Sequence, residues 1–469
     1  MTNVYSSPFA ERYSSKEMLY IFSPEKKFRT WRRLWIELAR AEKNLGLKRI
    51  TGAHLAEMEK HAEDIDLKAA RRHEEKTKHD VMAHIKAYED VAPKAKGIIH
   101  LGATSMYVVD NTDLILMRDA LGLIERELTN VVAALAAVAK KHASTPTVAY
   151  THFQPAQFTT VGKRACLWLS DLLMDLDEIA RLRASLRFLG VKGTTGTQAS
   201  FLALFDGNEA KVKKLDRDVA KAMGFSGTYA VSGQTYSRKV DSQILAALSG
   251  IAQTAHKFSN DLRLLQHLRE IQEPFDKDQV GSSAMAYKRN PMKSERMTAL
   301  SRFVITLYTN GAFTAASQWF ERTLDDSAGK RIAIPEAFLA TDAILQLFLE
   351  VASRLDVNEA AIRKNVDREL PDIASENLLM AAVKAGGDRQ ELHEVIRRHK
   401  MASQEGELLS RLISDPAFSS VKGRMSSLLE PTQYVGRSAS QVREFLKEEV
   451  GPRMKSRRKS LGLKSEVRV

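Results

Sequence analysis

The stretch DNTDLILMRDALGLIERELTNVVAALAAV, residues 110–138, decides the fold class of this chain. Its apolar side chains recur at alternating spacings of three and four residues: Leu114, Met117, Leu121, Ile124, Leu128, Val131, Leu135 and Val138. This heptad-like pattern is typical of a long helix that packs along one face. No proline interrupts the chain between Pro93 and Pro146, and Asp110 or Asn111 could cap the start of the helix. At 1.5 Å per residue, the pattern predicts a helix of roughly 40 Å.

Further long helical stretches are predicted at about 156–188, 239–270, 292–318 and 336–354, whereas strand signals are weak and short. Five long helices favour an all-α bundle over a single helical stalk. We expect three helical domains, at about 1–104, 105–357 and 358–469, with the long helices in the middle one. Their apolar stripes are more than one chain can easily cover, so we expect four middle domains to complete one central bundle in a homotetramer.

The composition limits the class of protein. The 469 residues are too many for one core, and 44% hydrophobic with 28% charged residues is an ordinary globular balance. Residues 1–12 lack the apolar segment of a signal peptide, and no apolar run approaches the ~18 residues of a membrane span. Cys166 is the only cysteine, which excludes an intrachain disulfide. We therefore expect a cytoplasmic protein with no membrane partner.

The net charge of +13 favours anionic partners, either nucleic acid or a multiply charged small molecule. Most basic residues are spread among acidic ones along amphipathic segments, and the only dense run is KSRRK at 455–459. Solvated helix faces and a basic tail explain most of this charge.

Unusual polar blocks separate the predicted helices, at 98–105, 150–157, 192–200, 281–291 and 319–331. The block GSSAMAYKRNPMKSER at 281–296 combines two hydroxyls, two cations and an amide after Gly281, a residue that could act as a hinge. Local features alone favour a polar interhelical loop. A mobile loop that closes over an anion is the alternative that the residue types also allow.

Three of these blocks resemble, in the right order, the sequence blocks of the fumarase/aspartase superfamily. Residues 281–290 resemble its signature loop GSSxMPxKxN, with Ala286 in place of the usual proline. THFQPAQ at 151–157 and GATS at 102–105 resemble its other two blocks. Three ordered blocks are far more specific than one. The resemblance implies an all-α, three-domain fold with a tetrameric central bundle, and the elimination of fumarate from C4 dicarboxylates.

Other segments are similar to the adenylosuccinate lyase branch of that superfamily. They are RY at 12–13, KHDVMAH at 78–84, GTTGTQASF at 193–201, QTYSRK at 234–239 and WFERTLDDSA at 319–328. The resemblance implies purine-nucleotide substrates, adenylosuccinate and the succinylcarboxamide ribotide, each with two carboxylates and a phosphate. About four negative charges require a site rich in Arg, Lys, His and backbone donors.

The resemblance also implies residue roles. Ser282 is the general base, with Ser283 as the fallback, and Lys288 with the neighbouring amides would stabilise its alkoxide. His152 protonates the departing nitrogen, Glu295 orients that imidazole, and His79 is a phosphate or general-acid partner. The substrate-binding set is Arg12, Tyr13, Lys78, Asp80, Thr104, Ser105, Thr151, Gln234, Asn290, Arg296, Arg322, Ser327 and Arg331. No cofactor or metal is expected, and the family builds each site from three chains.

Two alternatives stay open at this point. Argininosuccinate lyase belongs to the same superfamily, although its loop usually carries Gln-Lys-Lys-Asn where this chain has Tyr-Lys-Arg-Asn at 287–290. A basic helical scaffold that binds nucleic acid would explain the net charge, but it would not explain five ordered polar blocks. We expect no specific nucleic-acid partner.

Overall fold

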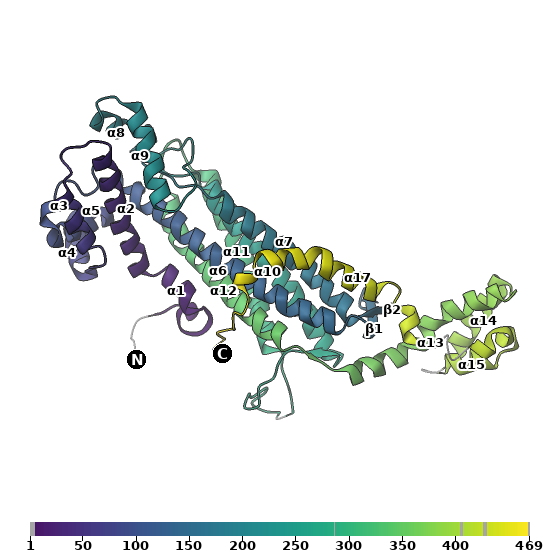
Figure 1. Ribbon diagram of the computed structural model, residues 1–469. Coiled ribbons are helices and arrows are strands. Elements are labelled where there is room, and N and C mark those ends of the chain that lie inside the picture. Colours follow the sequence, from purple (N-terminus) through teal and green to yellow (C-terminus); the bar gives the residue numbers. More distant parts are fainter. Residues whose placement is uncertain (1–4, 286, 404–406, 425–428, 468–469) are drawn as a thin grey trace.

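The computed structural model describes residues 5–285, 287–403, 407–424 and 429–467. Ala286, the departure from the superfamily loop, lies outside the described residues. Figure 1 shows an elongated molecule, with the N-terminal helices at one end, long helices side by side in the middle, and a smaller helical group at the opposite end. The mainly helical class predicted from the sequence is confirmed.

The N-terminal end of the molecule consists of short helices around α2. Its elements are η1 (Phe9–Tyr13), α1 (Lys16–Ile21), α2 (Pro24–Asn44), α3 (Gly52–Lys60), α4 (Leu67–Thr77), α5 (Asp80–Val91) and η2 (Pro93–Ala95). Side chains cap the N-termini of several of these helices. Ser15, Ser23, Thr51 and Asp66 each accept a hydrogen bond from a backbone N–H in the first turn of the helix that follows.

The middle of the molecule is the predicted bundle. Its elements are α6 (Ser105–Lys141), β1 (Pro146–Thr151), β2 (Gln154–Thr160), α7 (Val161–Ser185), α8 (Ala199–Leu204), α9 (Glu209–Ala222), α10 (Lys239–His267), β3 (Ile271–Gln272), α11 (Met292–Ser317), α12 (Asp326–Ser353) and β4 (Asp356–Val357). In α6, the predicted seam residues from Leu114 to Leu135 are all fully buried, and only Val138 is partly exposed. The seam prediction is therefore confirmed.

Three predicted boundaries are wrong. Helix α6 begins at Ser105, not at Asp110 or Asn111, because tertiary partners satisfy those two side chains inside the bundle: Asp110 contacts Arg238, and Asn111 bonds the backbone of Gly190. Helix α7 begins at residue 161, not 156, because residues 154–160 pair as strand β2. Helix α12 begins at residue 326, not 336, with Pro335 inside it.

The C-terminal part has a small core of its own and a tail that returns to the bundle. Its elements are α13 (Glu359–Lys384), α14 (Arg389–Ala402), α15 (Leu408–Ser414), η3 (Pro416–Arg424), η4 (Pro431–Tyr434), α17 (Ser438–Phe445), η5 (Leu446–Val450), α18 (Gly451–Ser456) and η6 (Arg458–Ser460). Leu378, Leu392, Leu412 and Phe418 form the separate core. The segment from α17 onward runs back along the bundle (Figure 1). The domain boundaries at 104/105 and 357/358 stay predictions.

Helix α12 is long and apolar enough to cross a membrane by length and composition alone. Within its most apolar 18-residue window, 83% is buried inside the bundle. The core of a folded bundle also requires such a helix, so burial inside the bundle accounts for the apolar character of α12.

Candidate active site

Eight of the predicted site residues line one cleft, with a volume of about 290 Å³, where the N-terminal helices meet the bundle. They are His79, Asp80, Thr104, Ser105, Gln234, Arg322, Ser327 and Arg331. The N-termini of α5, α6 and α12 all reach this cleft, since Asp80, Ser105 and Ser327 belong to their first turns. Helix N-termini carry partial positive charge and unpaired N–H groups, so their convergence favours an anion.

Short contacts join residues that lie far apart in the sequence. His79 caps α5, because its Nδ1 accepts a hydrogen bond from the N–H of Met82 at 3.4 Å. Its Nε2 is then the protonated nitrogen and lies 3.2 Å from Ser105 Oγ. Gln234 donates to Thr104 at 3.4 Å across the cleft. Lys78, the left-handed C-cap of α4, directly precedes His79.

Arg331 is the cleft cation that a ligand could most easily recruit. Its guanidinium is 54% exposed and lies 3.3 Å from the Asp80 carboxylate. Such a half-exposed pair contributes little to stability, so an incoming anion could replace Asp80 at small cost.

A buried ionic network supports the cleft from behind. Arg238 contacts Asp110 at 2.9 Å and Asp326 at 2.6 Å, and these three side chains are fully buried. Lys330 contacts Asp110 at 3.0 Å and Asp113 at 2.6 Å. Burial acts to raise the pKa of Asp110, but Lys330 and Arg238 outweigh it and lower that pKa, so the carboxylate stays ionised.

Glycines bring the loops of this region into close contact. A Cβ on Gly196, where φ is +81°, would lie 1.9 Å from the carbonyl oxygen of Ser232. A Cβ on Gly233 would lie 2.4 Å from the carbonyl oxygen of Glu321, which also accepts from the N–H of Gln234 at 2.9 Å. The missing side chains therefore allow Gln234 to sit beside Arg322.

Thr151 and His152 lie elsewhere: Thr151 ends strand β1, and His152 stands in the exposed turn of the β1–β2 hairpin. His152 and Phe153 both have positive φ, 53° and 58°. Glycine or asparagine usually occupies such turn positions, and two other residues there imply backbone strain of the kind found at functional sites. The sequence predicted a linking segment here, and the alternation that marks a strand is too weak to reveal the hairpin.

The predicted catalytic loop, residues 281–291, lies between α10 and α11. Ser282 Oγ accepts hydrogen bonds from the N–H groups of Ala284 at 3.4 Å and Met285 at 3.2 Å. Asn290, predicted to bind substrate, donates to the carbonyl of Gly281 at 2.9 Å and closes the base of the loop. Lys288, on the same loop, is exposed.

Gly281, the predicted hinge, also allows a close backbone contact within the loop. A Cβ there would lie 2.1 Å from the carbonyl oxygen of Lys288, so two parts of the loop cross where only glycine fits. Glu273 anchors the far end of the loop by accepting from the N–H groups of Lys293 at 3.0 Å and Ser294 at 2.8 Å. Sequence reasoning missed Glu273, because nothing local distinguishes it from a surface carboxylate.

A third group gathers on the first turns of α11. The Arg296 guanidinium lies 5.8 Å from the ring centre of Tyr13, and Arg12 is exposed beside it in η1. Glu295 is exposed in the first turn of α11. Within the described part of the chain, no hydrogen bond or ion pair joins Glu295 to His152. The predicted carboxylate–imidazole pair does not form inside one chain.

Other polar residues of the region were not predicted from the sequence. His100 is half-buried, and its Nδ1 accepts a hydrogen bond from the Trp35 indole at 2.9 Å. Burial, and secondarily His79, lower the pKa of His100 to about 4. His84, the last residue of the KHDVMAH segment, is buried and stacks on Phe28 with ring centres 3.7 Å apart.

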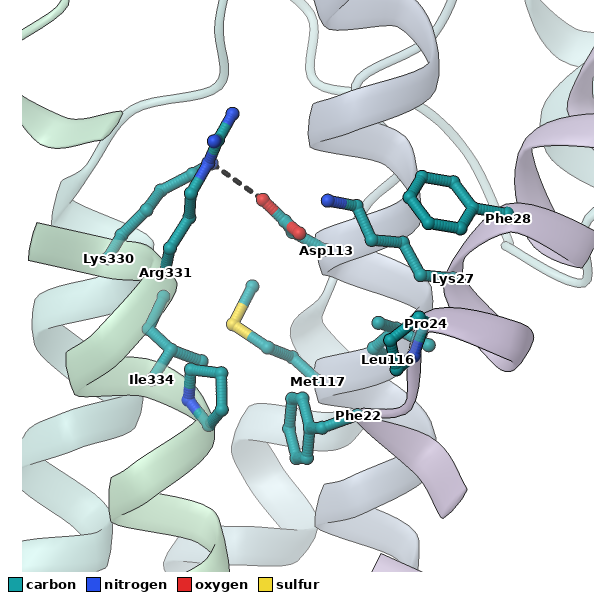
Figure 2. Close-up of a pocket in the computed structure, with 11 residues that line it drawn as sticks. Phe22, Pro24, Lys27, Phe28, Asp113, Leu116, Met117, Lys330, Arg331 and Ile334 are labelled. Carbon is teal, nitrogen blue, oxygen red and sulfur yellow. Dashed lines mark ion pairs between the residues drawn. The ribbon is translucent and has the colours of Figure 1, made fainter. Parts of the chain in front are cut away.

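A second cavity of about 290 Å³ lies behind the cleft, and Lys330 and Arg331 line both. Figure 2 shows Lys27, Lys330 and Arg331 around Asp113 at one end and apolar side chains at the other. Within the described residues, no group of three or more His, Cys, Asp and Glu side chains could hold a metal ion.

Comparisons with known proteins agree with these blocks. Residues 11–306 match the family described as "Lyase", and residues 371–445 match "Adenylosuccinate lyase C-terminus". The chain is 48% identical to the adenylosuccinate lyase of Saccharomyces cerevisiae, over 95% of each protein. It is 46% identical to that of Schizosaccharomyces pombe, again over 95% of each, and 30% identical to that of Pyrococcus abyssi, over 92% of this chain and 95% of that protein.

Solved structures share the fold. A 3-carboxy-cis,cis-muconate lactonizing enzyme from Pseudomonas putida has a TM-score of 0.83 and 24% identity, covering 94% of this chain and 98% of that one. A fumarate lyase from Mesorhizobium sp. BNC1 has a TM-score of 0.81 and 23% identity, covering 95% and 100%. At such identities, the likeness shows the architecture alone.

Proposed function

Because the chain belongs to the adenylosuccinate lyase family, a family of carbon–nitrogen lyases, we propose that it releases fumarate from adenylosuccinate and from the succinylcarboxamide ribotide, SAICAR, leaving AMP and AICAR. The resemblance drawn from the sequence blocks is thereby confirmed. The single observation that carries the substrate assignment is the cleft in which eight predicted residues meet three helix N-termini.

The cleft is the nucleotide-binding part of the proposed site. Arg331 and Arg322, with the N-termini of α5, α6 and α12, would hold the phosphate, which replaces Asp80 as the partner of Arg331. The buried network keeps Lys330 and Arg322 in place. Lys330 is already paired with Asp110 and Asp113, and Arg322 with Asp326, so Arg331 and the helix ends supply most of the uncompensated positive charge and Arg322 adds to it.

The elimination needs a base that removes a proton from carbon and an acid that protonates the nitrogen leaving the neighbouring carbon. Ser282 removes the proton from the carbon beside a carboxylate, and the two N–H groups on its Oγ, with Lys288, stabilise its alkoxide. His152 then protonates the departing nitrogen, and Glu295 orients its imidazole. His79 and Ser105, 3.2 Å apart, would bind the phosphate or a substrate carboxylate.

No single chain can assemble this site. The cleft lies at the start of α6, and the His152 turn lies beyond the end of this 37-residue helix, so roughly 55 Å of helix separates them. That span far exceeds a nucleotide. We therefore propose a homotetramer in which the cleft of one chain, the hairpin of a second and the 281–291 loop of a third form each site. A stable monomer in sedimentation at micromolar concentration would contradict this arrangement.

The activity is tested by products. Purified protein incubated with adenylosuccinate should yield AMP and fumarate in equal amounts, and argininosuccinate should yield no fumarate. The matched control is Ser282→Ala, which should bind substrate with little change in affinity and release neither product. Fumarate from argininosuccinate, with none from adenylosuccinate, would refute the substrate assignment. We also propose a cytoplasmic location, which fractionation of the source cells would test.

A further inference from the structure

A buried pair of acids, Glu127 on α6 and Asp342 on α12, lies deep in the bundle at a distance from the cleft. Glu127 is 1% exposed and Asp342 is fully buried. Neither forms an ion pair within the described residues. Such a pair is unusual, because two carboxylates buried without a cation cannot both remain ionised.

The hydrogen bonds of the pair show where its proton lies. Asp342 accepts from the N–H of Ser15 at 2.6 Å and from the hydroxyl of Ser15 at 2.7 Å. Glu127 Oε1 accepts from Gln346 at 2.6 Å, whereas Glu127 Oε2 is buried without a partner when both acids are ionised. The two carboxyl groups are hydrogen-bonded to each other, and a proton on Glu127 Oε2 that is donated to Asp342 satisfies every one of these atoms.

The surrounding charges agree with a protonated Glu127. Burial, followed by the Asp342 charge, raises the pKa of Glu127 well above its ordinary value, and Arg126 opposes this only weakly. Burial also raises the pKa of Asp342, against the hydrogen bonds from Glu127 and Ser15, and Glu466 adds to the rise. Glu127 is therefore the acid that keeps the proton.

The other side of Asp342 holds the N-terminal segment in place. Ser15 is the N-cap of α1, and Ser14 donates to the carbonyl of Leu339 on α12 at 2.9 Å. Arg12 and Tyr13 come directly before these two anchored serines, and Arg296 lies over the Tyr13 ring. The position of η1 thus depends on the hydrogen bonds between α12 and residues 14–15.

We propose that Asp342, held by the proton on Glu127, positions Arg12 and Tyr13 for substrate binding. This inference rests on the proposed function, which gives Arg12 and Tyr13 their contact with substrate. Asp342 and Glu127 touch no substrate; they act through Ser14 and Ser15. The same chain of bonds continues to the C-terminal tail, since Gln346 accepts from the N–H of Glu466 at 2.8 Å.

Two isosteric substitutions separate a positioning role from general packing. Glu127→Gln reproduces the protonated acid, because its amide NH₂ donates to Asp342 and its oxygen accepts from Gln346. We expect KM and kcat within twofold of the parent. Asp342→Asn places an NH₂ where an acceptor is needed, so KM for adenylosuccinate should rise about tenfold or more, with kcat changed less than threefold. Thr341→Val, which alters a neighbouring buried residue without touching Ser15, should change neither.

Thermal denaturation tests the proton directly. Above the unfolded pKa of a glutamate, the folded parent binds one proton more than the unfolded chain, so the parent loses stability as pH rises. Glu127→Gln has no such proton, and its Tm should exceed that of the parent by a margin that grows from pH 6 to pH 9. A constant margin would overturn the assigned proton.

A folded Asp342→Asn protein with KM within twofold of the parent would overturn the positioning role. If Asp342→Asn does not fold, Ser15→Ala serves instead, because it removes one anchoring bond; KM should rise at least threefold, and an unchanged KM overturns the role. An inactive parent protein would instead count against the proposed function.

Discussion

Replacement of Arg238 by methionine should be among the most destabilising single changes in the chain. Arg238 is fully buried and contacts two fully buried carboxylates, Asp110 and Asp326, at 2.9 and 2.6 Å. Within the described residues, its loss leaves Lys330 as the only cation on Asp110 and Arg322 as the only cation on Asp326. Breaking a buried pair by removing one partner costs about 3–5 kcal/mol.

That free energy sets the size of the thermal shift. With 469 residues and about 2.1 cal/mol/K per residue, the entropy of unfolding is about 1 kcal/mol/K if the chain unfolds as one unit. Arg238→Met should therefore lower Tm by about 3–5 °C. KM for the nucleotide substrate should rise as well, because Asp326 and Lys330 hold the wall of the cleft.

Two further variants serve as references when the Tm shift is measured by calorimetry. Arg453 also contacts two carboxylates, Asp177 at 2.8 Å and Glu449 at 2.9 Å, but its side chain is 29% exposed. Arg453→Met should shift Tm by about 1 °C or less. Arg238→Lys keeps the charge without the fork of donors and should fall between the two. If Arg238→Met shifts Tm no more than Arg453→Met, the buried network does not stabilise the wall of the cleft.

Three further predictions follow from the site. Gly281→Ala should lower kcat at least ~10-fold at unchanged Tm, because its Cβ would lie 2.1 Å from the Lys288 carbonyl oxygen and force the loop apart. Unchanged turnover in steady-state kinetics would refute the need for this close contact in the loop. Ser282→Ala should lower kcat by about 10² or more with a much smaller change in affinity, and normal turnover would move the base to another residue. The pKa of His100 is lowered to about 4, so between pH 4 and pH ~6.5 the unfolded chain binds a proton here and the folded chain does not. The free energy of unfolding should therefore fall by up to about 3 kcal/mol as the pH drops from ~6.5 to 4. His100→Phe should flatten that slope in urea titrations, and an unaltered slope would contradict it.

Much of the bundle was predictable, because burial leaves a periodic trace in the sequence. The eight-residue seam of α6 gave the right helix and the right face, and seven of its residues are fully buried. The boundaries failed where tertiary partners override local preference. Asp110 has the chemistry of a helix cap, but Arg238, 128 residues later, holds it inside the helix instead.

The site was predictable as residues, and its arrangement only in part. Sequence blocks identified eight residues that meet in one cleft, and the long helix predicted between the blocks at 102–105 and 151–157 already separated His152 from that cleft. The roles of Arg238, His100 and Glu127 were not predicted, because polar residues inside the molecule are recognised only by the distant partners that satisfy them. Two positive φ values at His152 and Phe153 likewise leave no local signature.

Mixing two inactive variants tests whether each site combines parts of different chains. His152→Ala removes the proposed acid on the hairpin, and Ser282→Ala removes the proposed base on the loop. After subunit exchange, mixed tetramers should contain some sites with both native residues and should recover a substantial part of the parent activity on adenylosuccinate. Exchange itself is checked with differently tagged parent chains under the same conditions. Activity that stays at background after confirmed exchange would contradict shared sites.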